Sequence, residues 1–75
     1  MRNESVRDES DHLARITRLY AIAARIFGSR AEAERWMDTP NRGLDGARPA
    51  DEFATEAAAR NVEDLLGRIE YGIFG

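Results

Sequence analysis

The residue best suited to acid–base or metal chemistry in this chain is its single histidine, His12. It stands among Asp8, Glu9 and Asp11 near the expected start of a helix, where a solvated histidine is the ordinary outcome. Cysteine is absent. Because one histidine without any cysteine does not make the usual zinc sites, we expect no metal site here.

Carboxylates are plentiful, but their spacing is poor for catalysis. Close neighbours occur at i, i+1 or i, i+2, in the pairs Glu32/Glu34, Asp51/Glu52 and Glu63/Asp64. Residues at these spacings do not share a helix face, so we expect solvated carboxylates with i, i+4 partners such as Arg68 for Asp64. No serine is placed for a catalytic triad, and the Gly-Lys-Ser/Thr ending of a phosphate loop is missing. The sequence therefore predicts no catalytic residue, no cofactor and no enzyme activity.

A helical apolar period after residue 8 predicts the first and longest helix. Its stripe consists of Leu13, Ile16, Leu19/Tyr20, Ala23/Ala24 and Phe27. Asp8 or Ser10 is expected to cap the start of this helix, and Gly28 to end it. Residues 1–8 carry mixed charges and almost no apolar side chains, so we expect a disordered lead-in at 1–8 and one folded domain at 9–75.

Ser29 and Glu32 have the spacing of a capping box, which opens a second helix from Arg30 to about Asp38. Trp36 lies on the apolar side of this helix, as Phe27 does on the first, and both are expected in the core.

Residues 39–49 are dense in Pro, Gly, Asn and Asp and predict an ordered connection rather than a flexible linker. Leu44 is its expected anchor in the core, and Asp45-Gly46 its tight turn. Pro49 suits the first position of a one-turn helix, after which Phe53 points inward.

The last helix is expected to start after a Thr55 cap and to end at Gly72. Its apolar stripe is Ala58, Val62, Leu65/Leu66 and Ile69, and a short apolar tail follows at 73–75. Since no segment has a strand period, the sequence predicts an all-α fold, a small compact domain of three main helices plus a one-turn helix in the connecting loop.

The charge balance narrows the classes of partner. The net charge is −3, and all 11 basic residues are arginine. This balance and the acidic last helix argue against direct binding to nucleic acid. The chain does not begin with a signal peptide, and no apolar run reaches the ~20 residues of a membrane span, so we expect a cytoplasmic protein without a membrane partner.

Four segments in a fixed order carry a family resemblance. They are Ile26-Phe27-Gly28, Ala33-Glu34-Arg35-Trp36-Met37, the stretch from Pro40-Asn41 through Leu44 and Gly46 to Pro49, and the stretch from Val62 through Arg68-Ile69 to Tyr71-Gly72. In this combination the chain resembles the toxin-binding domain of the Xre, MbcA and ParS antitoxins, from about residue 13 to its C-terminus. Asp45 stands where that family commonly has glycine.

The resemblance implies a protein partner rather than a substrate. Such antitoxins belong to bacterial type II toxin–antitoxin systems and neutralise RES-type toxins that consume NAD, by blocking the active site with the last helix and the C-terminal tail. The partner-binding residues that we expect on this basis are Asn41, Arg42, Arg48, Arg68, Glu70, Tyr71, Ile73, Phe74 and Gly75. The alternative hypothesis is a helical homodimerisation module without a toxin partner, in which the same apolar tail and helix pair with a second copy.

Overall fold

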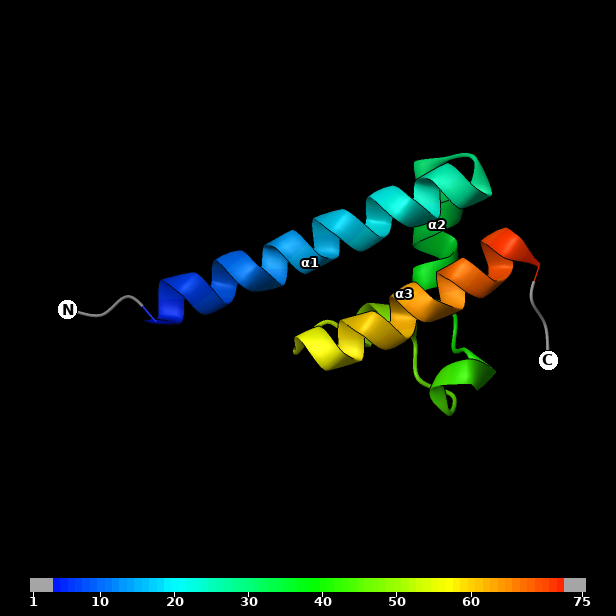
Figure 1. Ribbon diagram of the computed structural model, residues 1–75. Coiled ribbons are helices and arrows are strands. Elements are labelled where there is room, and N and C mark those ends of the chain that lie inside the picture. The colour runs from blue at the N-terminus through cyan, green and yellow to red at the C-terminus, as the bar shows by residue number, and fades with distance from the viewer. Residues whose placement is uncertain (1–3, 73–75) are drawn as a thin grey trace.

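Over the described residues 4–72, the computed structural model in Figure 1 consists of three α-helices and two short 3-10 helices. The structure describes residues 4–72, with side chains from residue 8 onward. The elements are α1 (Glu4–Phe27), α2 (Arg30–Met37), η1 (Arg42–Leu44), η2 (Pro49–Asp51) and α3 (Glu56–Tyr71). The predicted all-α fold is confirmed, and η1 adds a second short turn to the connecting loop.

The first helix is longer than predicted. It begins at Glu4, so the prediction that Asp8 or Ser10 caps its start is wrong, and residues 4–8 of the expected lead-in are helical. An apolar period detects only the part of a helix that is buried, whereas residues 4–12 are mostly polar and contain no glycine or proline that would stop a helix. The other end is as predicted, because Gly28 follows the helix with φ +96°.

The predicted caps place the other two helices. The Ser29 hydroxyl accepts a hydrogen bond from the Glu32 backbone N–H at 3.1 Å, while the Glu32 carboxylate lies 4.0 Å from Arg35 instead of bonding back to Ser29. The Thr55 hydroxyl accepts from the Ala58 N–H at 3.1 Å. Gly72 ends α3 with φ +67°. Each cap satisfies a backbone group that the first or last turn of a helix leaves unpaired.

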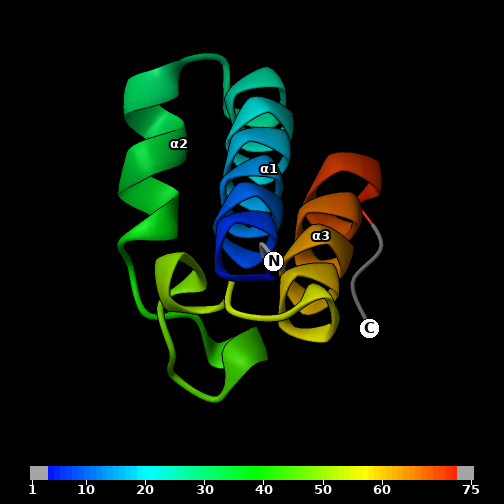
Figure 2. The same ribbon diagram turned by 90° about the vertical axis from the view of Figure 1, so that its left-hand side faces the viewer.

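The helix α1 lies between α2 and α3 and contacts both, as the view in Figure 2 shows. The connecting loop passes beneath from α2 to α3. Arg15 ties this loop to α1, because its guanidinium donates to the backbone carbonyls of Phe53 and Ala54 at 2.9 and 3.1 Å. The N-terminal turns of α1 project beyond the other helices (Figure 1). Leu13 of α1 is 62% exposed.

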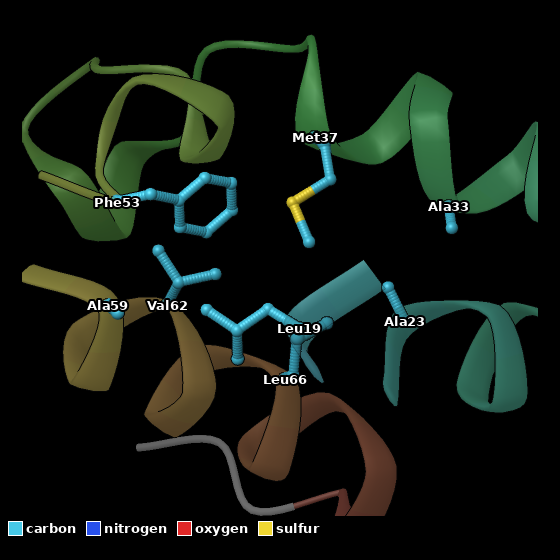
Figure 3. Close-up of a cluster of buried hydrophobic side chains, with 8 residues drawn as sticks. All are labelled: Leu19, Ala23, Ala33, Met37, Phe53, Ala59, Val62 and Leu66. Carbon is cyan, nitrogen blue, oxygen red and sulfur yellow. The ribbon is translucent and has the colours of Figure 1, made fainter. Parts of the chain in front are cut away.

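Side chains from all three helices and the loop meet in one core (Figure 3). Its buried members are Leu19, Ala23, Ala33, Met37, Phe53, Ala59, Val62 and Leu66. In α3 the fully buried alanine is Ala59 rather than the predicted Ala58, because Ala59 shares one face with Val62 and Leu66 at spacings of three and seven residues. The small alanines Ala23 and Ala33 let α1 and α2 approach closely.

The aromatic pair Phe27 and Trp36 was predicted to lie in the core, and the structure confirms this only in part. Both side chains pack against the core but are half-buried, with ring centroids 5.7 Å apart. Trp36 lies about 100° around α2 from the buried Met37, on the flank of this two-turn helix. The two rings therefore cover one edge of the core instead of filling it.

The helices of the described part of the chain are too short or too polar to cross a membrane.

Leu19 is expected to be the most sensitive core position, because it is fully buried where the three helices meet. Leu19→Ala removes buried methyl groups and leaves a cavity, which lowers the free energy of unfolding by about 2–5 kcal/mol. Leu13→Ala is the matched control on the same helix and changes it by less than about 0.5 kcal/mol. Urea denaturation measures both, and equal losses would contradict this description of the core.

Candidate functional site

Asn41, an expected contact residue, holds the connecting loop together. Its side-chain oxygen accepts from the Gly43 N–H at 2.8 Å. Its backbone carbonyl accepts from the N–H groups of Leu44 and Gly46, each at 2.9 Å, and its own N–H donates to Ala47 at 3.0 Å. Because all these bonds are internal and the residue is half-buried, Asn41 shapes the surface more than it presents a free polar group.

Two backbone positions give this turn its shape. Asp45 has φ +58°, in the left-handed region that glycine adopts without strain and aspartate tolerates better than most residues. Gly43 packs so closely on α3 that a Cβ atom there would lie 2.6 Å from Cδ2 of Leu65. The loop is therefore fixed against α3.

The side chain of Arg48 is engaged by neighbouring carboxylates, whereas that of Arg42 is exposed. The Arg48 guanidinium donates two hydrogen bonds of 3.0 Å to the Asp51 carboxylate and lies 4.0 Å from Asp38. These bonds raise the pKa of Arg48 and lower that of Asp51 from its ordinary 3.8. The depressed Asp51 pKa means that the pair stabilises the loop above pH 3.8 and that this contribution is lost as the pH falls through the lower folded value. Arg42 is exposed.

The C-terminal end of α3 carries three more of the expected contact residues. Arg68 and Tyr71 are exposed, Tyr71 to 73%. The Glu70 carboxylate is hydrogen-bonded to the Arg25 guanidinium of α1. Three further expected residues, Ile73, Phe74 and Gly75, lie outside the described residues.

A polar hollow of about 280 Å³ brings Arg68 next to the connecting loop. It lies between the η1 turn and α3, and its lining residues are Gly43, Leu44, Asp45, Glu52, Asn61, Asp64, Leu65 and Arg68. The predicted ion pair between Asp64 and Arg68 is not formed within 4.0 Å, although both line this hollow. The hollow is open and shallow, and it fits contact with a partner surface better than enclosure of a substrate.

A row of ion pairs between α1 and α3 was not predicted. Three arginines of α1 face three glutamates of α3, in the pairs Arg15–Glu56 (4.0 Å), Arg18–Glu56 (3.1 Å), Arg18–Glu63 (3.9 Å) and Arg25–Glu70. The signal in the sequence was the shared seven-residue spacing, since Arg18 and Arg25 recur as Glu63 and Glu70 do. Such a repeat marks two helices that run side by side over several turns.

Most of the chain, including α2, the connecting loop and α3, is shared with known proteins. Residues 23–72 match the family described as "Antitoxin Xre/MbcA/ParS C-terminal toxin-binding domain". Three curated proteins named Antitoxin Xre are similar to the chain. That of Yersinia enterocolitica is 40% identical over 68 residues, which cover 89% of this chain and 46% of the relative.

The other two relatives give the same result. The protein of Photorhabdus laumondii is 42% identical over 67 residues, which cover 88% of this chain and 45% of the relative. That of Pseudomonas putida is 34% identical over 65 residues, which cover 87% and 41%. The chain spans less than half the length of each of these curated relatives.

The left-handed backbone of Asp45 leads to a testable difference between two substitutions. Asp45→Ala places a less tolerant residue at φ +58° and is expected to lower the free energy of unfolding by about 1 kcal/mol. Asp45→Gly relieves the strain and is expected to stay within about 0.5 kcal/mol of the parent, or to exceed it. Thermal or urea unfolding distinguishes the two, and equal destabilisation by both would show that the aspartate side chain matters more than the backbone.

Proposed function

Because this chain belongs to the Xre/MbcA/ParS antitoxin family through its toxin-binding domain, we propose that it is an antitoxin that binds and blocks a protein toxin. The match over residues 23–72 carries the proposal, because it covers α2, the connecting loop and α3 without interruption. The names of the three relatives agree with it. On this proposal the chain acts in the cytoplasm by binding to the surface of the toxin, and it performs no catalysis itself.

The partner that we propose is a RES-type toxin, the class of NAD-consuming enzyme that the family resemblance implies. The contact surface would be the hollow beside α3 together with the C-terminal end of that helix. Arg42, Arg68 and Tyr71 are exposed there or close by in sequence, which makes them the contact residues that we favour. The side chains of Asn41, Arg48 and Glu70 form hydrogen bonds within the chain. On this proposal they hold the contact surface in shape rather than bind the toxin.

The C-terminal tail is the proposed blocking element. Tyr71 already projects an aromatic ring at the end of α3, and Phe74 follows three residues later in the sequence. The NAD pocket of the proposed toxin must hold a ring and an anionic pyrophosphate. The rings of these two residues would suit it, as would the carboxylate of Gly75 where this is the natural terminus. Buried aromatic anchors of this kind commonly dominate the energy of an interface.

The alternative is self-association. The observation that favours it is Leu13, a large apolar side chain of α1 that is 62% exposed. A homodimer through α1 would not exclude toxin binding through α3, since the two surfaces lie at different ends of the fold. Light scattering on the parent protein and on Leu13→Glu decides whether a dimer exists and whether it uses this helix.

Removal of the aromatic rings at the end of α3 and in the tail is expected to abolish most neutralisation. The double change Tyr71→Ala and Phe74→Ala should weaken toxin binding at least about 30-fold, because one hot-spot residue alone contributes ~2 kcal/mol or more. Toxin-driven NAD consumption in the presence of each variant measures the effect. Leu13→Ala is the matched exposed control and should inhibit like the parent.

Deletion of Ile73 to Gly75 tests the same element without a change in α3. Circular dichroism should show helicity close to that of the parent, while inhibition falls sharply. A folded, trimmed chain that inhibits as well as the parent would exclude the tail and leave the hollow beside α3 as the blocking surface.

A further inference from the structure

The last ion pair between α1 and α3 lies directly beside the proposed contact surface. Arg25, in the last turn of α1, reaches the Glu70 carboxylate with both terminal nitrogens, and its Nη2 lies 3.4 Å from Oε1 of Glu70. Glu70 precedes the exposed Tyr71 and lies two residues before Gly72, where α3 ends. The pair therefore ties down the final turn of the helix.

This turn has few other restraints. The last carbonyl groups of a helix lack partners within the helix, and terminal turns consequently fray. Of residues 69–72, only Ile69 contributes apolar burial, and it is half-buried. The Gly72 N–H donates to the Arg68 carbonyl and closes the helix end, but it does not link the turn to the rest of the fold. Arg25 supplies that link from a different helix.

The Arg25–Glu70 pair fixes the orientation of the helix end more than it adds to the stability of the fold. Its side chains are 60% exposed for Arg25 and 27% exposed for Glu70, and the Glu70 carboxylate raises the pKa of Arg25 through hydrogen bonding. Exposed ion pairs contribute little to global stability. A forked guanidinium on a carboxylate nevertheless fixes the relative position and rotation of the two groups, which a single charge does not.

We propose that Arg25 is a positioning residue for toxin binding, which acts by holding Glu70 and with it the final turn of α3 in the orientation that presents Tyr71. The inference rests on the proposed function. Arg25 itself lies on α1, outside every residue assigned above to the contact surface. Its loss would leave the fold intact, and the binding free energy would then include the cost of ordering the turn and its side chains.

The neighbouring pair supplies a matched control. Arg18 lies about two turns before Arg25 on α1 and pairs with Glu56 and Glu63, both farther from the end of α3 than Glu70 is. Both arginines are exposed and both link α1 to α3. A general loss of helix pairing would affect both variants alike, whereas loss of positioning would affect Arg25 alone.

The experiment compares Arg25→Ala, Arg18→Ala and the charge swap Arg25→Glu with Glu70→Arg in the full chain. Affinity for the toxin encoded by the neighbouring gene is measured by calorimetry, and amide exchange is measured at residues 69–72 without toxin. Arg25→Ala is expected to weaken binding by about three- to tenfold and to speed exchange in this turn. Arg18→Ala is expected to do neither, and the swap is expected to restore both.

Three results would overturn the inference while leaving the proposed function in place. They are normal binding by Arg25→Ala, an equal loss in Arg18→Ala, and a swap that restores slow exchange without restoring affinity. The last result would make Glu70 a direct contact. Failure of the parent chain to bind that toxin would instead contradict the proposed function, and the inference with it.

Discussion

This structure depends on one constraint, which is that helix α1 must be buried on two sides. The chain has 75 residues, and a domain of that size buries a smaller fraction of its surface than a larger one. It meets this constraint by placing α1 between α2 and α3, with Leu19 at the point where all three meet and alanines where two helices approach closely. The connecting loop closes the remaining side through Phe53, held in place by Arg15.

The same arrangement determines which side chains remain available to a partner. Since α3 turns Ala59, Val62 and Leu66 toward the core, its opposite face and its C-terminal end stay exposed. The loop brings η1 against that helix through the close approach of Gly43 to Leu65 and creates the polar hollow beside Arg68. A continuous surface thus forms from two segments that are distant in sequence, and both lie within the region shared with the antitoxin family.

The sequence predicts features that depend on adjacent residues, and it misses features that depend on which elements lie side by side. Caps and stops depend on a few adjacent residues, so Ser29, Thr55, Gly28 and Gly72 were placed correctly. The start of α1 was missed because solvated turns leave no apolar period. The internal bonds of Arg48 and the cross-helix partner of Glu70 depend on which elements lie side by side, which local patterns do not specify. For Trp36 the local pattern predicts the correct side of α2. It does not predict how deeply the ring is buried, because that depends on how short α2 is.

On the proposed function, this fold presents the end of α3 and the adjoining loop to a toxin while α1 serves as the support. Hydrogen exchange of the chain, measured with and without the proposed toxin partner, tests this most directly because it locates the contact without altering a residue. The account predicts added protection at residues 65–72 and in the loop at 42–46, with residues 8–14 of α1 unchanged. Protection confined to residues 8–14, with the end of α3 unaffected, would contradict it.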